Sequence, residues 1–200
     1  MPGTLHDQSS YNMNDYQETI VAIGNAMSVY SDPFYSVWGF GAKFGDETRH
    51  VFQCGPTAEA RGVEGVLEAY KSVFESDLTL SGPTLFDQVL QSAAVRANQH
   101  KKAGYKRFCV LLIITDGISQ NMEETKRKLE VYRQVPLAVI FVGVGRSDFK
   151  SMHALSDYSN TTFVEFRKHQ HDPSSLGKAA LKDIPHQFVQ YMINSGMHPE

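Results

Sequence analysis

Two short polar segments in the middle of the chain carry oxygen atoms that could hold a metal ion. Asp116 and Gly117 directly follow the apolar run VLLIIT at 110–115, and SGPTLFD at 81–87 presents Thr84 at the start of an expected helix. A carboxylate at the end of a buried strand needs a cation, backbone N–H donors or solvent. Carboxylate and hydroxyl oxygens are hard ligands, so Thr84 and Asp116 together predict a site for Mg²⁺ or Mn²⁺.

Each segment also has a simpler interpretation, which stays open at the level of sequence. Asp116 and Gly117 can form an ordinary turn, with the Asp116 side chain capping a helix that starts near Asn121. Thr84 can be a common N-cap after the turn at Pro83. Taken singly, neither segment requires a metal; taken together, they favour one.

Composition and charge exclude several classes of function. Two hundred residues with 42% hydrophobic content suit one domain with a sizeable core. A net charge of −3 gives no basic field for a nucleic acid backbone. No apolar run approaches the roughly 20 residues of a membrane span, and MPGTLHDQSS does not resemble a secretory signal, so we expect an intracellular protein. Cys54 and Cys109 are too few for a disulfide framework or a zinc knuckle.

Helical and strand patterns alternate along the chain. Asn14 is the expected cap of the first helix, and Asp172 with Pro173 begins a C-terminal helix that Pro185 should kink or divide. The strands 36–42 and 49–55 should form a hairpin through Phe44, Gly45 and Asp46. The other elements are predicted helices at 14–30, 63–75, 85–100, 122–135 and 148–156 and predicted strands at 108–115, 137–145 and 161–167.

This alternation predicts an α/β fold with a doubly wound, mainly parallel sheet and helices on both faces. The strands at 108–115 and 137–145 are apolar throughout, so both should be interior strands buried on two sides. Functional groups in such sheets gather at the carboxyl ends of the strands. Asp116 lies at such an end.

Five segments together resemble the von Willebrand factor A type domain of copines. They are GFGA at 39–42, SGPT at 81–84, LLIITDG at 111–117, VIFVGVG at 139–145 and FRKHQHDPSSLGKAALKDIPHQFVQY at 166–191. The resemblance begins near Leu5 and covers nearly the whole chain, so we treat 1–200 as a single copine-type domain. It implies a Rossmann-like doubly wound sheet, a metal-ion-dependent adhesion site, and a protein partner that offers a carboxylate to the metal.

Copines as a family also carry amino-terminal modules for calcium-dependent phospholipid binding. We expect none of those modules within this chain. Membrane association would then come only through modules outside it, with a cytoplasmic protein that reaches the plasma membrane peripherally in its full-length form.

One third of the family's adhesion site departs from the pattern. The site needs a loop of the type Asp-x-Ser/Thr-x-Ser after the first, central strand, then the threonine loop (Thr84, supported by Ser81 and Gly82), then the aspartate loop (Asp116 and Gly117). The only candidate for the first loop is HDQSSYN at 6–12, where Tyr11 replaces the second serine and no apolar strand precedes. We interpret HDQSSYN as the lead into the first helix.

The chain is therefore expected to begin after the central strand and to lack it. Two ligands then leave at least about four of the six positions around Mg²⁺ to water, so Mg²⁺ or Mn²⁺ should bind weakly. The inward edges of the GFGA and LLIIT strands should have no ladder partner.

The leading interpretation is a non-catalytic protein-interaction module. The first alternative is the substrate-binding part of a copine-like RING ubiquitin ligase, but a RING needs roughly eight ligands dominated by cysteine and this chain has two cysteines. The second is a metal-dependent hydrolase, which would want a further acid or lysine at a neighbouring strand end, where Gly143 and Gly145 stand instead.

Two further clusters have simple interpretations. Lys101, Lys102, Lys106 and Arg107 form a local basic cluster, which we interpret as a charged loop, with contact to anionic lipid as the alternative. The pair at His169 and His171 suits a solvated loop better than a metal site.

Overall fold

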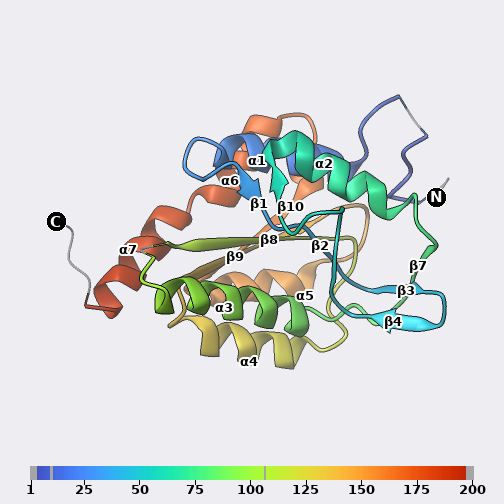
Figure 1. Ribbon diagram of the computed structural model, residues 1–200. Helices are drawn as coiled ribbons and strands as arrows, with labels where there is room; N and C mark the ends of the chain where they lie inside the picture. The colour runs from blue at the N-terminus through green and yellow to red at the C-terminus, as the bar shows by residue number, and fades with distance from the viewer. Residues whose placement is uncertain (1–3, 10, 106, 197–200) are drawn as a thin grey trace.

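A three-stranded parallel sheet forms the centre of the molecule in the computed structural model, which describes residues 4–9, 11–105 and 107–196 (Figure 1). Its strand order is β10-β9-β8. The strands are β8 (Cys109–Thr115), β9 (Leu137–Gly143) and β10 (Thr161–Glu165). The predicted α/β class is confirmed, and the carboxyl ends of these strands lie along one edge.

Helices cover both faces of this sheet. On one face lie α1 (Asp15–Met27), α2 (Gly62–Val73) and α6 (Pro173–Leu181), and on the other lie α3 (Asp87–Lys102) and α4 (Met122–Tyr132) (Figure 1). Shorter helical segments are α5 (Lys150–His153), η1 (Ala154–Asp157) and η2 (Phe166–Lys168). The last helix is α7 (Ile184–Asn194).

The caps predicted at Asn14 and Asp172 are present. The alternative role of Thr84 as an N-cap is wrong, because Phe86 is the N-cap residue of α3 and no side chain among the described residues caps that helix. The Asn14 side chain accepts a hydrogen bond from the Gln17 backbone, and the Gln17 side chain accepts one from Asn14, a reciprocal capping box. The Asp172 side chain caps α6, with Pro173 at the first helical position. Pro185 lies in the first turn of α7, so the C-terminal helix is divided, as one of the two predicted outcomes had it.

The segment before α2 differs from its prediction. The expected strand at 36–42 is broken into β2 (Trp38–Gly39) and β3 (Ala42–Phe44), because Gly41 takes a φ of +70° between them. The predicted hairpin is confirmed between β3 and β4 (Glu47–Arg49), with Gly45 in its turn. Other short strands are β1 (Phe34–Tyr35), β5 (Phe52–Gln53), β6 (Ala60–Arg61) and β7 (Leu78–Leu80).

These short strands pair only in the antiparallel sense. β3 pairs with β4 and with β7, β2 pairs with β5, and β1 pairs with β6. The prediction of a mainly parallel sheet is therefore correct only for the central sheet. The GFGA segment lies outside that sheet, contrary to the expectation that it would be one of its strands.

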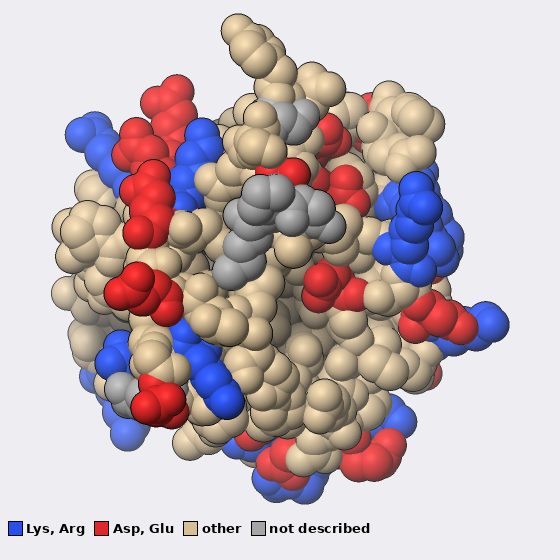
Figure 2. Space-filling model, turned by 90° about the vertical axis from the view of Figure 1, so that its right-hand side faces the viewer, with Lys and Arg blue, Asp and Glu red and all other residues tan. Residues whose placement is uncertain are grey.

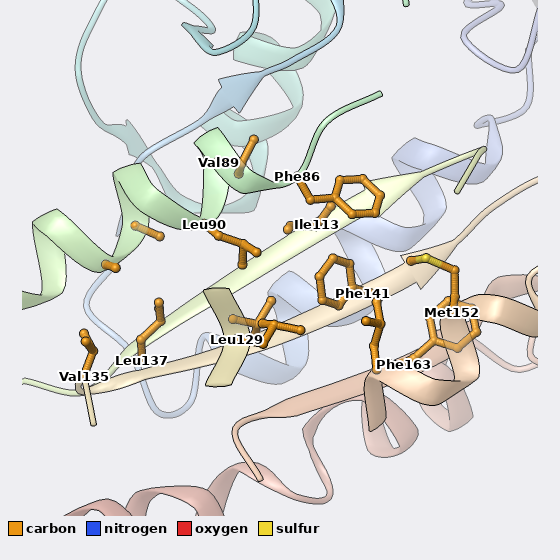
Figure 3. Packing of buried hydrophobic residues seen from close by; sticks show 14 of the residues in the cluster. Phe86, Val89, Leu90, Ile113, Leu129, Val135, Leu137, Phe141, Met152 and Phe163 are labelled. Atoms are coloured by element: carbon orange, nitrogen blue, oxygen red, sulfur yellow. The ribbon is translucent and has the colours of Figure 1, made fainter. Parts of the chain in front are cut away.

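Two apolar clusters fill the space between the central sheet and its helices. Phe86 and Leu90 from α3 and its entry pack against Ile113 of β8 and Phe141 of β9 on one face (Figure 3). Ile23 of α1 belongs to the cluster on the opposite face. β9 contributes to both clusters and is buried along its whole length, as predicted for an interior strand.

β8 is an edge strand of the described structure. This differs from the interior position that its apolar sequence alone predicts, and it agrees with the expectation that the inward edge of the LLIIT strand has no ladder partner. Most of its residues are only half-buried, and its one strand partner within residues 4–9, 11–105 and 107–196 is β9. The Cys109 amide donates to Pro136 and the Thr115 carbonyl accepts from Val144, so the odd-numbered residues bond toward β9. Backbone groups alternate along a strand, and those of Val110, Leu112 and Ile114 therefore face the open edge.

Candidate functional site

The loop that carries Thr84 and the loop that follows Asp116 lie against each other. The Gln120 backbone N–H donates to the Thr84 carbonyl oxygen at 3.0 Å. The Gln120 side-chain nitrogen lies 3.7 Å from the position that a Cβ on Gly82 would occupy. Both predicted metal-ligand loops therefore meet at the carboxyl end of β8.

Asp116 is exposed directly after the last residue of β8. The Ser147 hydroxyl donates to its backbone carbonyl, which ties the turn after β8 to the loop after β9. Its carboxylate, by contrast, has no hydrogen-bond or ion-pair partner among the residues described. The side chain that caps α4 is that of Asn121, which accepts from the Glu124 amide, so the alternative role of Asp116 as a helix cap is wrong.

The residues around the two ligands shape their loops. The Thr115 hydroxyl donates to the Gly117 carbonyl at 2.9 Å and accepts from the Gly117 amide, which tightens the turn at Asp116. The Ser81 amide donates to the Gly41 carbonyl at 2.9 Å, which joins the threonine loop to the bend between β2 and β3. Thr84 itself is half-buried, and its hydroxyl has no partner in the part of the chain that is described.

The charge of Asp116 shifts the pKa of two nearby aromatic side chains. Burial raises the pKa of Tyr16, and the Asp116 carboxylate raises it further. Burial lowers the pKa of His6, while the Asp116 carboxylate opposes that shift. The His6 ring stacks on Tyr16 with centroids 4.2 Å apart, and its Nδ1 lies 2.9 Å from the Tyr70 hydroxyl. The His6 ring therefore lies in an aromatic cluster near Asp116.

The N-terminal segment is fixed to the same edge of the sheet. The Asp15 carboxylate accepts from the Gly145 amide at 3.1 Å, across 130 residues of sequence. Gly145 takes a φ of +75°, which favours glycine, and the Leu5 side chain lies against it. Leu5, Asp15 and Tyr16 were not predicted as site residues, because only the fold brings the chain's start next to Gly145 and Asp116.

The Asp-x-Ser stretch near the start of the chain is satisfied locally. The Asp7 carboxylate accepts from the Ser9 amide at 2.9 Å and from the Ser9 hydroxyl at 2.6 Å. Residues 4–9 lead into α1 without a strand. This geometry agrees with their interpretation as a lead into the first helix.

The face at the carboxyl ends of the central strands carries no broad field of one charge. Figure 2 looks onto this face, where both acidic and basic side chains are spread over the surface. Within the described ranges, no three His, Cys, Asp or Glu side chains gather closely enough to hold a metal by themselves. Any metal at this face would depend on oxygen ligands such as Thr84 and Asp116, with further ligands from elsewhere.

The two cysteines and the predicted histidine pair take no part in this site. Cys54 and Cys109 are free thiols, and burial raises the pKa of Cys54 to about 12. His169 bonds to the Ser175 hydroxyl at 2.7 Å, and His171 lies 3.0 Å from Gln170. No helix among residues 4–9, 11–105 and 107–196 has the length and apolar content to cross a bilayer.

Comparisons of the sequence with known proteins identify a family for this chain. The sequence model of the copine family matches residues 4–200. The chain is 34% identical over 213 residues to Copine-E of Dictyostelium discoideum and 35% identical over 222 residues to Copine-C of the same organism. It is 33% identical over 220 residues to Protein BONZAI 1 of Arabidopsis thaliana.

These matches cover 98–100% of this chain and 37–41% of the three relatives. The chain thus spans well under half of the length of the relatives it matches. None of the three names denotes an enzymatic activity. The family model and the three relatives match nearly the whole chain, so the chain belongs to the copine family.

Proposed function

We propose that this chain is a non-catalytic protein-interaction module that binds its partner at the carboxyl edge of the central sheet. The observation that carries this proposal is the exposed Asp116 carboxylate, which ends an apolar strand and has no partner among the described residues. A free carboxylate at that position is suited to a ligand that arrives from outside.

A divalent metal is the ligand that this edge suits best. The Thr84 hydroxyl and the Asp116 carboxylate would contact Mg²⁺ or Mn²⁺, and Ser81, Gly82 and Gly117 would support the two loops. A metal ion here supplies a positive centre for a partner's carboxylate. Because two ligands leave at least about four positions open, metal should bind only weakly to these residues alone.

The open edge of β8 provides a place for further ligands. A parallel strand added there would pair with Val110, Leu112 and Ile114 and would end beside Asp116. The copine pattern Asp-x-Thr-x-Ser follows such a strand, so one addition would complete both a doubly wound sheet of the von Willebrand factor A type and the first loop of the metal site.

The wider setting is also part of the proposal. Residues 1–200 act as a single copine-type domain of a cytoplasmic protein, whose calcium-dependent phospholipid binding resides in other modules. The RING ligase alternative gains no support. Neither does the hydrolase, since the neighbouring strand end carries Gly143 and Gly145 in place of an acid or lysine, and the nearby Asp15 carboxylate is engaged with the Gly145 amide.

An extended chain tests this proposal. The segment that precedes the matched region in Copine-E is fused to the N-terminus, and Mn²⁺ binding is measured by titration calorimetry. We expect binding at least about tenfold tighter than for the unextended chain, because the added loop supplies metal ligands. Asp116→Ala and Thr84→Ala should each remove most of that gain.

The matched control is Asp148→Ala, which alters an exposed carboxylate that pairs with Lys150 in the loop after β9. It should leave Mn²⁺ binding by the extended chain unchanged. Equal binding with and without the Asp116 carboxylate would rule out the proposed site.

A further inference from the structure

The last helix, α7, exposes apolar side chains to solvent. Phe188 is 41% exposed, Val189 is 52% exposed and Ile193 is 64% exposed. The sequence from Ile184 to Asn194 contains no Asp, Glu, Lys or Arg. An uncharged helix with an apolar outer side is unusual on a surface in water and marks a surface that contacts something else.

The inner side of α7 holds this helix firmly in place. Gln187 and Tyr191 are buried. The Phe108 ring lies 5.4 Å from the Phe188 ring and 5.9 Å from the Tyr191 ring, measured between centroids. The outer apolar side chains are therefore presented on a rigid support and not on a loose tail.

Basic residues lie beside α7, where Lys101 contacts Tyr191 and Arg107 directly precedes Phe108 in the sequence. Lys101 and Lys102 end α3 and are exposed, and the Lys101 ammonium lies 5.5 Å from the centroid of the Tyr191 ring. Neither lysine has an acidic partner in the described part of the chain. Arg107 is exposed and pairs with Asp32 at 3.2 Å.

The acidic group nearest in sequence to α7 is already engaged. The Asp183 carboxylate accepts from the Thr162 hydroxyl at 3.2 Å and lies 3.9 Å from the Lys182 ammonium. The exposed aromatic ring of Tyr105, 5.4 Å from the Arg107 guanidinium, adds an amphipathic side chain beside this basic residue. Aromatic and basic side chains around an apolar centre are typical of surfaces that lie in a bilayer interface.

We propose that Phe188, Val189, Ile193, Lys101 and Lys102, here named the α7 surface, bind the interface of an anionic lipid membrane without calcium. The three apolar side chains would enter the headgroup region, and the two lysines would contact lipid phosphates. This departs from the expectation that membrane association comes only from modules outside the chain.

The size and shape of the α7 surface favour a membrane over a second copy of the chain. Its three apolar side chains expose roughly 300 Å² in total, taking about 150–250 Å² for each whole side chain. A stable dimer needs about 800 Å² from each partner. The patch also lies on the convex outer side of one helix, which suits a flat and deformable interface.

The α7 surface and the metal site could be used together. Phe108 precedes the first residue of β8 and Asp116 follows the last. Seven strand residues span about 23 Å, so the two sites lie at opposite ends of the sheet (Figure 1). A chain bound to lipid through α7 would keep its Asp116 edge directed away from the bilayer.

Flotation with lipid vesicles in a chelator tests the inference. Vesicles of phosphatidylcholine with about a quarter phosphatidylserine are mixed with the chain in EDTA and floated through a density gradient, which leaves aggregates behind. We expect at least about fivefold more floated protein than with phosphatidylcholine alone. The double variant Val189→Asp with Ile193→Asp should return to the phosphatidylcholine level, and Lys101→Gln with Lys102→Gln should lose the preference for phosphatidylserine.

The control is the double variant Val95→Asp with Val131→Asp, which adds the same two negative charges at residues of α3 and α4 that are 51% and 56% exposed and distant from α7 in sequence. It should float like the parent chain, and circular dichroism should show that all variants are folded. Equal flotation of the parent and the α7 double variant would overturn the inference. So would a concentration-dependent dimer that the α7 double variant loses, because a second copy would then occupy this surface.

Discussion

Replacing Phe86 by alanine is expected to lower the free energy of unfolding by about 3–5 kcal/mol, the range for a large buried aromatic residue. Phe86 is fully buried at the N-cap of α3. Its ring meets Phe40 edge-on at 5.9 Å and Phe141 at 5.3 Å (Figure 3). Alanine would leave a cavity between α3 and β9 that neither ring can fill without moving.

The position of Phe86 also connects stability with the candidate site. It follows Thr84 by two residues and anchors the loop that carries it. A loss of about 3–5 kcal/mol is a large share of the about 5–15 kcal/mol that stabilises a small domain in all. Urea unfolding followed by circular dichroism measures the free energy of unfolding of the parent chain and of Phe86→Ala.

The matched control for Phe86 is Val95→Ala, on the exposed side of the same helix. It should change the free energy of unfolding by no more than about 0.5 kcal/mol. A loss below about 1 kcal/mol for Phe86→Ala would show that this ring does not hold the loop against the sheet.

The second large effect is expected at Glu165, the last residue of β10. Its buried carboxylate contacts the His153 ring at 2.7 Å and two cations, Arg167 at 2.8 Å and Lys168 at 2.8 Å. These hydrogen bonds, against the opposing effect of burial, lower the pKa of Glu165 from 4.5 to about 2. The depressed pKa means that the ionised carboxylate stabilises the fold above pH 4.5 and that this contribution is lost as the pH falls toward 2.

Glu165→Gln keeps the shape of the side chain and removes its charge. Because the three partner side chains are each about half exposed, we expect a loss of about 2 kcal/mol at pH 7, less than the full pKa shift would imply. Thermal unfolding at a series of pH values should show the parent and the variant converging as the solution is made acidic. A difference that stays constant from neutral to acidic pH would contradict the role of the ionised carboxylate.

Glu130→Gln is the control for Glu165→Gln. Glu130 pairs with Arg133 on the outside of α4, where both side chains are exposed. It should alter stability by no more than about 0.5 kcal/mol at any pH.

Local pattern was sufficient for most elements of the fold. Asn14, Asp172 and Pro185 each mark a helix start through short-range chemistry, and the unbroken apolar run of β9 predicted an interior strand. Apolar pattern alone was misleading for β8, whose sequence is equally apolar but whose second edge has no strand partner among the described residues. That open edge was expected only from the comparison with the copine pattern. An apolar sequence indicates that a strand can be buried. It does not indicate which strands pair with its two edges.

The candidate site also contains residues that local pattern predicted and residues that it did not. Asp116 and Thr84 could be named because each follows a recognisable local pattern, and the Gln120–Thr84 hydrogen bond now joins their loops. The contacts of Leu5 and Asp15 with the Gly145 loop could not be predicted, because they join residues about 130 apart through the fold. The break at Gly41 depends on a positive φ. The sequence contains fifteen glycines and does not indicate which of them take this conformation.

The central claim is that Asp116 belongs to a metal site for which this chain supplies only part of the ligands. Titration calorimetry of the unextended chain with Mn²⁺, and separately with Mg²⁺, tests it most directly. With two protein ligands, binding should be millimolar or weaker, and Asp116→Ala should abolish what remains. Micromolar binding that is lost in Asp116→Ala would contradict the claim, because the chain would then hold a complete site.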